Sequence, residues 1–489
     1  MIELFQVLLN TGMSYNRAFL QLIETLGLTT PTNDYIEITG QDPVLDTPYL
    51  IGEALAGSLG AQAAAVTKIW KMRTTASNRN RDHDQRVCID IRAAVNSASG
   101  ISNVHQSGHF IKTGLEDDPT FRIYKTLDDK WIFIAGIYPH LRDGLLKLLN
   151  CVNTQTSIGQ AIARWDSFDL ENAIADNELV GSALHTQQEW RDSRQGRELL
   201  NVPVVDIIKI GESDPEKFRA PKSTSTKPIR PLSNIRVLDM TRVLAGPLAS
   251  RLLAEQGADV LHISSPNLPY LHAALLETGF GKRSAFIDLE QQRDVQLLRN
   301  LIAGADIFSE NYHRSGLAKY GLSPLDLANI RPGIIYVSES AFGEVGPWQN
   351  RRGVDQIAQM VTGMAAEMGS IGSPKLFPQG YYFIDYLTGY LAAAGACAAL
   401  IKRAVEGGSY WVRVSLTRSA MWVQDLGRID TTKRTFIYDT TLEERDKYMM
   451  KSNSPFGVLK HTAPVAKYSK TPSYFEYPVA PLGAHNPVW

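Results

Sequence analysis

Asp385 is an acid placed where it could do chemistry. It lies in the segment Tyr381–Gly389, at the start of an alanine-rich stretch that predicts a helix. A carboxylate in the first turn of a helix is stabilised by the helix dipole, so we expect Asp385 to stay ionised. Taken alone, the position is more simply explained by a structural N-cap or first-turn acid.

A second stretch suggests an anion site. Residues 235–247 begin with a short apolar run, break at Arg242, pass Gly246-Pro247 and continue with leucines at helical spacing. This pattern predicts a strand, a tight loop and a helix N-terminus, and residues 257–263 predict a second strand. The N-terminus of such a helix offers free N–H groups to an anion, although a βαβ unit without a ligand fits the pattern equally well.

Seven motifs in order give these residues a context. They are VLDMTRVLAGP, EQGADVLHI, GKRSAFIDL, ADIFSENY, SESAFGEVGPW, RRGVDQIAQMVTGM and FIDYLTGYLAAAG. Their series resembles the class III CoA-transferases, the family of formyl-CoA transferase and carnitine CoA-transferase, with α-methylacyl-CoA racemase as a relative. The resemblance covers residues 231–489, and seven ordered motifs are far more specific than a single glycine signature.

The resemblance implies a role for Asp385. Its position matches the nucleophilic aspartate of the family, which would attack a thioester carbonyl to give a mixed anhydride. The CoA thiolate would then form an aspartyl-CoA thioester, and an acceptor acid would leave as the new thioester. This chemistry takes the coenzyme A thioester as substrate and needs no metal or redox cofactor.

The resemblance also implies a set of CoA contacts. CoA is a large anion, so its phosphates need cations and N–H donors nearby. The matching positions are Arg242, Val243, Ala245, Ile287, Asn311, Tyr312, Lys319, Tyr320 and Arg352. Each of these residues taken singly is better explained as a surface charge or a core residue. They are candidates for CoA contacts because they occur in the same order as in the family.

Three departures from the family pattern bear on specificity. Formyl-CoA transferases carry glutamine at the position of Leu244, so oxalate is not the expected acceptor. Ser264-Ser265 replaces a basic residue after the second strand, which removes one expected phosphate contact. Val354 stands where the racemases carry histidine. The absence of that histidine favours transfer over a two-base proton exchange.

Three further features have alternative or structural roles. Asp355 is a second acid near the site, or the N-cap of a helix at 356–364. Glu53 occupies the position of the nucleophile in an internal repeat, and we interpret it as structural. Ser97–Gly100 is a weak candidate for the family's glycine-rich loop.

The elements that position these residues form an α/β unit. Strands are predicted near 235–239, 258–263, 285–288, 306–309, 334–337 and 411–416, with helices between most of them. This alternation predicts a doubly wound, Rossmann-like parallel sheet of the CoA-transferase family III type, with a smaller α+β domain.

The N-terminal half contains an incomplete copy of the same unit. Leu55, Gly57 and Leu59 align with Leu387, Gly389 and Leu391 in two small-residue helices, and each helix precedes a polar loop and a strand. A hairpin at 121–135, helices at 141–149, 165–175 and 186–199, and a strand at 202–208 follow. Residues 424–462 are expected to be irregular. The predicted domains are 1–110 (degenerate first copy), 111–210 (small α+β domain), 211–230 (linker) and 231–489 (CoA-binding domain with a C-terminal return).

Composition restricts the partners. The 489 residues hold 50 Lys and Arg against 51 Asp and Glu, so bulk charge favours neither nucleic acid nor a membrane surface. The three cysteines are scattered, no signal peptide is recognised, and no membrane span is expected, which together predict a cytoplasmic protein. The partners expected are an acyl-CoA, a carboxylic acid and, from the resemblance, a second copy in a homodimer.

Three functions remain open. The first is CoA transfer with Asp385 as nucleophile. The second is a racemase or isomerase of α-branched acyl-CoA with Asp385 as base. The third is a degenerate CoA-binding protein, which the broken repeat makes reasonable.

Overall fold

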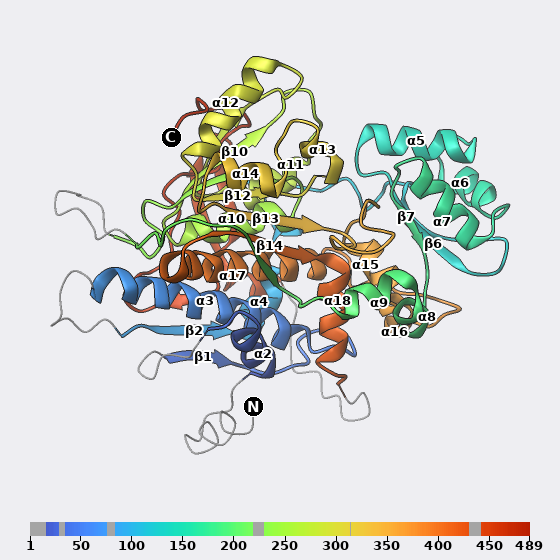
Figure 1. Ribbon diagram of the computed structural model, residues 1–489. Helices are drawn as coiled ribbons and strands as arrows, with labels where there is room; N and C mark the ends of the chain where they lie inside the picture. Colours follow the sequence, from blue (N-terminus) through green and yellow to red (C-terminus); the bar gives the residue numbers. More distant parts are fainter. Residues whose placement is uncertain (1–15, 29–34, 76–83, 219–228, 313, 430–441) are drawn as a thin grey trace.

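The computed structural model describes residues 16–28, 35–75, 84–218, 229–312, 314–429 and 442–489. The sequence also predicts a short helix at Phe5–Leu9, which lies outside these ranges, as do residues 219–228, half of the predicted linker. Figure 1 shows a large sheet above a layer of long helices, a small sheet below that layer, and a separate small unit at one side.

Seven strands form the large sheet in the order β11-β10-β9-β12-β13-β14-β8. They are β8 (Asp206–Gly211), β9 (Arg236–Met240), β10 (Asp259–Ser264), β11 (Lys282–Phe286), β12 (Ile307–Glu310), β13 (Ile335–Ser340) and β14 (Ser409–Ser415). Six are parallel, and β8 pairs antiparallel with β14. Counted from β9, the parallel strands follow the doubly wound order 3-2-1-4-5-6, so the predicted fold class is confirmed.

Helices cover both faces of this sheet, which explains why its central strands are buried almost throughout. The shorter helices that follow these strands along the chain, up to residue 425, are α10 (Ala245–Glu255), α11 (His272–Thr278), α12 (Gln292–Ala303), α13 (Arg314–Ala318), α14 (Pro324–Ile330), α15 (Asp355–Val361), α16 (Met364–Met368) and α18 (Leu416–Asp425).

Two long helices lie side by side in the middle of the molecule (Figure 1). They are α3 (Ile51–Thr75) and α17 (Phe383–Glu406), and their alanines and glycines form the centre of the main core. By length and composition α17 could cross a membrane, although no membrane span is predicted from the sequence. Its 18-residue apolar window is 94% buried inside the protein, so packing accounts for its apolar surface.

The internal repeat also appears in the order and pairing of the helices and strands. β1 (Tyr35–Thr39), α3, β2 (Arg86–Asp90) and α4 (Ile91–Ser97) occur in the same order as β13, α17, β14 and α18, with α15 and α16 added between β13 and α17. In each unit the two strands are parallel, and a third strand pairs antiparallel with the second: β17 (Lys467–Tyr468) with β2, and β8 with β14.

A crossing helix also recurs in both units. The N-terminal end of α2 (Arg17–Thr25) meets α3 at Gly57, and that of α10 meets α17 at Gly389. A Cβ atom on Gly57 would lie 2.7 Å from the Phe19 nitrogen, and one on Gly389 would lie 2.6 Å from the Ala245 carbonyl oxygen. The aligned glycines therefore allow the same close helix packing twice.

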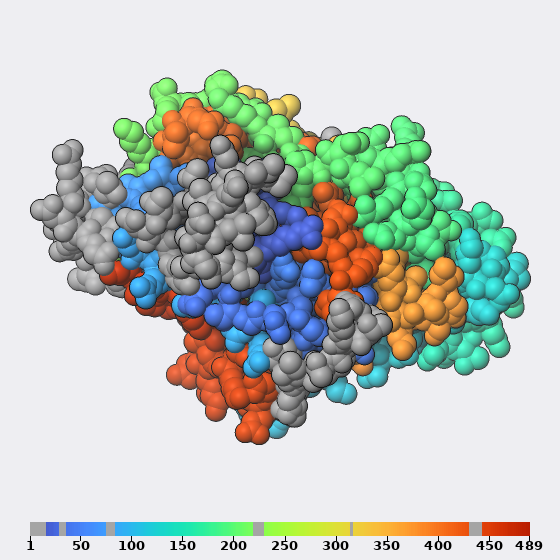
Figure 2. Space-filling model, turned by 90° about the horizontal axis from the view of Figure 1, so that it is seen from below, coloured from blue at the N-terminus to red at the C-terminus, as the bar shows by residue number. Residues whose placement is uncertain are grey.

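The small unit forms one end of the molecule, as the cyan and teal atoms in Figure 2 show, and it shares a second hydrophobic core with α15 and α18. Its elements are β5 (Phe121–Lys125), β6 (Trp131–Ala135), β7 (Gly181–Ala183), α5 (Pro139–Leu149), α6 (Gln155–Ile162) and α7 (Ser167–Asp176). The antiparallel pairing of β5 with β6 agrees with the predicted hairpin.

Three predicted elements need correction. The helix predicted at 186–199 is two helices, α8 (Gln187–Asp192) and α9 (Arg194–Leu200), because Ser193 is extended and caps the second. The strand predicted at 202–208 begins four residues later, as β8, and it joins the large sheet rather than the small unit.

The third correction concerns the C-terminal part. Residues 449–462 are not irregular: β15 (Met449–Ser454) and β16 (Gly457–Thr462) form a hairpin that pairs with β3 (His105–Gln106), next to β4 (His109–Phe110). Its strands are partly exposed and polar, so they lack a clear apolar alternation. The short helix α19 (Leu442–Asp446) precedes the hairpin, and the 3-10 helix η1 (Gly100–Ser102) precedes β3.

Candidate active site

A cavity of about 680 Å³ opens at the carboxyl ends of the parallel strands, where the strand order reverses between β9 and β12. Ligands of doubly wound sheets bind at this switch point. The cavity is lined by Asp385 and by all nine residues predicted to contact CoA: Arg242, Val243, Ala245, Ile287, Asn311, Tyr312, Lys319, Tyr320 and Arg352. Residues far apart in sequence are therefore brought together, while their contacts with a ligand remain a prediction.

The small unit supplies cavity residues that sequence reasoning missed. Ile137, Tyr138, His140, Leu141 and Val180 line the same cavity. They follow β6 or precede β7, about 60 to 105 residues before Arg242, the nearest predicted contact, and no local pattern marks them. The site therefore lies between the small unit and the large sheet.

The loop after β9 is fixed by Asn311, which follows β12. The Arg242 N–H donates to Asn311 Oδ1 over 2.8 Å, and Asn311 Nδ2 donates to the Arg242 carbonyl over 2.9 Å. Asn311 Nδ2 also lies 3.1 Å from Glu339 Oε2. Val243 has a φ of +65°, which is unusual for a β-branched residue and marks this loop as strained.

Two arginines predicted to meet CoA contact the small unit. The Arg242 guanidinium lies 4.6 Å from the centre of the Tyr138 ring and donates to the Pro269 carbonyl. Arg352 Nη2 lies 3.4 Å from Glu178 Oε2. The His140 ring stacks on Tyr138, and burial, followed by Arg352 and Arg242, lowers the pKa of His140. Both arginines thus bridge the two walls of the cavity.

A buried ion pair supports the strand that precedes this loop. Asp239 in β9 accepts hydrogen bonds from Thr241 N (2.9 Å) and from Lys282 Nζ (2.9 Å). Burial alone would raise the pKa of Asp239, but Lys282 and His262 outweigh it and hold that pKa well below its ordinary value. Lys282 also donates to the Pro247 carbonyl, so the pair ties β9, β11 and α10 together.

Replacing Lys282 with methionine is expected to destabilise the protein by about 3–5 kcal/mol, because it leaves the Asp239 carboxylate buried without its cation. Urea unfolding measures this change. Arg283→Met is the matched control, since Arg283 pairs with Asp259 at the partly exposed edge of the same strand and should cost about 1 kcal/mol or less. Equal losses in both variants would contradict the role given to Lys282.

Asp355 lies directly behind Asp385. Its side chain is fully buried, and its Oδ2 accepts the backbone N–H groups of Ile384 (2.7 Å) and Asp385 (3.1 Å). Its other oxygen accepts a hydrogen bond from Gln359. Of the two roles left open for Asp355, that of N-cap of the following helix is wrong, because α15 begins at Asp355 itself; Asp355 caps α17 instead.

Asp385 is partly exposed to the cavity, but it does not have the electrostatic environment predicted for it. Burial, then Asp355, then Glu339 raise its pKa well above the ordinary value. Burial also raises the pKa of Asp355 to about 6, although three hydrogen bonds oppose the rise. The helix N–H groups thus stabilise charge on Asp355, and the expectation that Asp385 stays ionised is not supported.

The N-terminal repeat contains the same arrangement without the cavity. Asp42 accepts the N–H groups of Gly52 (3.1 Å) and Glu53 (2.8 Å) at the start of α3, and burial raises the pKa of Asp42 to about 6. Glu53 Oε1 lies 3.3 Å from the N–H of Ala18, in the crossing helix α2. Glu53 is not among the described residues that line the main cavity, and we still interpret it as a structural residue.

Ser97–Gly100 lies near the start of α17, where the Ala98 carbonyl accepts the N–H of Tyr382 over 3.0 Å. This places the segment close to Asp385, as its weak resemblance to the family's glycine-rich loop requires. Whether it acts as that loop remains a prediction.

Comparison with known proteins identifies the family. The model of CoA-transferase family III matches residues 232–486, which include Asp385 and all nine predicted contacts. The chain belongs to this family. The CoA-transferase match also includes every parallel strand of the large sheet, in agreement with the fold.

Several curated family members are similar to this chain. An acetyl-coenzyme A transferase nodX of Hypoxylon pulicicidum is 30% identical over 286 residues, 56% of this chain and 48% of that protein. A succinate–glutarate CoA-transferase of Agrobacterium fabrum is 36% identical over 206 residues, 38% of this chain and 51% of that protein. The chain thus spans about half the length of these relatives.

A solved structure with similarity to the chain is a CAIB/BAIF family protein from Brucella suis, at 30% identity and a TM-score of 0.37. The alignment covers 41% of this chain and 57% of that one.

Proposed function

We propose that this family III CoA-transferase moves CoA from an acyl-CoA thioester to a carboxylic acid, with Asp385 as the covalent nucleophile. The observation that carries the proposal is the position of Asp385, whose carboxylate borders the cavity lined by all nine predicted CoA contacts. The names of the relatives support the reaction class.

The reaction proceeds in four exchanges at carbonyl carbons. The Asp385 carboxylate attacks the donor thioester, which gives a mixed anhydride and CoA thiolate. The thiolate attacks the Asp385 carbonyl carbon and releases the donor acid, leaving an aspartyl-CoA thioester. The acceptor carboxylate attacks this thioester to form a second anhydride, and the thiolate then attacks the acceptor carbonyl and regenerates Asp385.

The chain's own residues divide the work along the cavity. Lys319, Arg352 and Arg242 supply positive charge for the phosphates of CoA. Asp355 does not reach the substrate, because its oxygens are occupied by Ile384, Asp385 and Gln359. It acts as a positioning residue that fixes the first turn of α17.

A hydroxylamine trap tests the proposal. The protein is incubated with a panel of acyl-CoAs and hydroxylamine, and intact mass and peptide mapping follow. A hydroxamate on Asp385 that is absent in Asp385→Ala is the expected result. Measurable CoA binding with no adduct and no turnover would instead favour a degenerate CoA-binding protein.

One observation favours a second candidate, a racemase or isomerase. Asp385 and Glu339 both border the cavity, and burial raises the pKa of Glu339 to about 7. Two acids with raised pKa values suit proton exchange at the α-carbon of an acyl-CoA. Solvent exchange of the α-hydrogen, measured by NMR in deuterium oxide, with no adduct in the hydroxylamine trap, would select this function over transfer.

The acylation rate is expected to increase with pH above the range in which an aspartate ordinarily titrates, because Asp385 must lose its proton before it attacks and burial, Asp355 and Glu339 raise its pKa. Single-turnover hydroxamate formation between about pH 5 and 9 measures this. Asp355→Asn removes a neighbouring negative charge and should move the midpoint to lower pH, whereas Asp42→Asn should leave it unchanged. A rate that is already constant from pH 5 would contradict the pKa assigned to Asp385.

We also propose that the protein is a cytoplasmic homodimer with no nucleic-acid or membrane partner, and that the CoA thioester is its substrate with no further cofactor. Light scattering after gel filtration tests the oligomeric state.

A further inference from the structure

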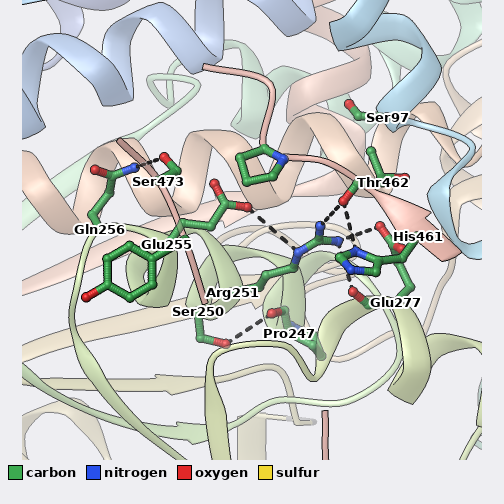
Figure 3. A network of polar contacts seen from close by, with 12 residues as sticks. Ser97, Pro247, Ser250, Arg251, Glu255, Gln256, Glu277, His461, Thr462 and Ser473 are labelled. Carbon is green, nitrogen blue, oxygen red and sulfur yellow. Dashed lines mark hydrogen bonds and ion pairs between the residues drawn. The ribbon is translucent and has the colours of Figure 1, made fainter. Parts of the chain in front are cut away.

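A buried polar cluster lies behind the first turn of α17. Figure 3 shows the Arg251 guanidinium between Glu255, Glu277 and Thr462. Arg251 Nη1 lies 2.5 Å from Glu277 Oε1, and Nη2 lies 2.9 Å from the Thr462 carbonyl oxygen. Arg251 and Glu277 are both almost fully buried, so the Glu277 carboxylate is held in one place by a desolvated, charge-assisted bond.

Tyr386 connects this cluster to the site. It follows Asp385 directly in the first turn of α17, and its side chain is buried on the core side of the helix. Its hydroxyl donates to Glu277 Oε1 over 3.4 Å and accepts the N–H of Ile101 over 2.9 Å. Successive helical residues point about 100° apart, so Tyr386 can anchor the turn while Asp385 faces the cavity.

The segment 98–101 completes the anchor from the N-terminal half. Its Ala98 carbonyl accepts the N–H of Tyr382, and its Ile101 N–H donates to Tyr386, so two bonds bracket Asp385 in sequence. The approach is close at Gly100, where a Cβ atom would lie 2.3 Å from Glu277 Oε1 and 2.7 Å from the Tyr386 hydroxyl. Only glycine leaves room for this arrangement.

The geometry points to Tyr386 as a positioning residue for Asp385, held in place by the Arg251–Glu277 pair and by segment 98–101. Asp355 fixes the turn by accepting the backbone N–H groups of Ile384 and Asp385. Tyr386 fixes the same turn through its side chain, whose hydroxyl bonds Glu277 and Ile101. This inference rests on the proposed function, because that function places the nucleophile, Asp385, in the first turn of α17. Small displacements of a reacting group are costly in rate, so the anchor should affect catalysis more than binding.

The test compares Tyr386→Phe with Tyr390→Phe. Substitutions of Arg251 or Glu277 would break a buried ion pair and unfold part of the protein. Tyr390 is the matched control, because it lies one turn further along α17, is equally buried and bonds the Ser97 hydroxyl rather than Glu277. Tyr386→Phe is expected to lower kcat about ten- to thirtyfold with KM for the acyl-CoA changed less than about threefold, and Tyr390→Phe to change neither by more than about threefold.

Amide hydrogen exchange provides a readout that does not depend on the reaction. The N–H groups of residues 382–387 should exchange at least about fivefold faster in Tyr386→Phe than in Tyr390→Phe. Equal exchange in the two variants, or equal losses of kcat, would overturn the positioning role. A wild-type protein that forms no adduct with hydroxylamine would overturn the proposed function alone, because the exchange comparison would still judge the anchor.

Discussion

Replacing Asp385 with asparagine is expected to lower the rate of CoA transfer by at least about a thousandfold, because the amide cannot attack the thioester carbonyl. The substitution is nearly isosteric and removes a carboxyl group whose pKa is raised by burial and by two acids. Folding should therefore be unimpaired, and the affinity for acyl-CoA should change less than about threefold. Initial rates of formation of the acyl-CoA product measure CoA transfer. Calorimetric titration with CoA measures the change in binding affinity.

The internal repeat supplies the control for this variant. Glu53 occupies the position aligned with Asp385 at the start of α3, but outside the main cavity. Glu53→Gln should leave the transfer rate within about twofold of the wild type. A large loss of rate in Glu53→Gln, or normal turnover in Asp385→Asn, would refute the assignment of the nucleophile.

Replacing Asp355 with alanine is expected to lower kcat about a hundredfold, since the first turn of α17 loses the acceptor of two N–H groups and Asp385 loses its fixed position. The lost cap should also reduce the free energy of unfolding by about 1–2 kcal/mol. Steady-state kinetics and urea unfolding of the same preparation measure both effects.

Asp42→Ala removes the equivalent cap of α3. It should cost a similar free energy of unfolding and leave kcat unchanged within about twofold. A comparable loss of kcat in Asp42→Ala would show that Asp355 acts through general stability rather than through the position of Asp385.

Local patterns in the sequence predict much of the fold. The six parallel strands lie within a few residues of their predicted places, because short apolar β-branched runs between helices have few alternatives in an α/β domain. The hairpin β15–β16 was not predicted, since its strands are half exposed and lack apolar alternation. The break between α8 and α9 depends on the extended backbone of Ser193, which no periodicity reveals.

The site divides in a similar way. The loops after β9 and β12 could be located because they follow predicted strands, and their residues do border one cavity. Tyr138 and His140 could not be found, since only the folded chain brings the small unit to the cavity. The pKa of Asp385 was predicted with the wrong sign, because the helix dipole is a local property whereas Asp355 and Glu339 approach through tertiary structure.

The duplicated helix gives the molecule an internal evolutionary record. After a duplication, positions that serve folding are retained in both copies, while positions that serve chemistry can drift in the copy that has lost its cavity. The cap acids Asp42 and Asp355 and the crossing glycines Gly57 and Gly389 agree between the copies. Glu53 and Asp385 differ by one methylene group. Both copies thus keep the acid that caps the helix start, although only one of them presents a residue to the main cavity, so the cap is required by folding whether or not a nucleophile follows it.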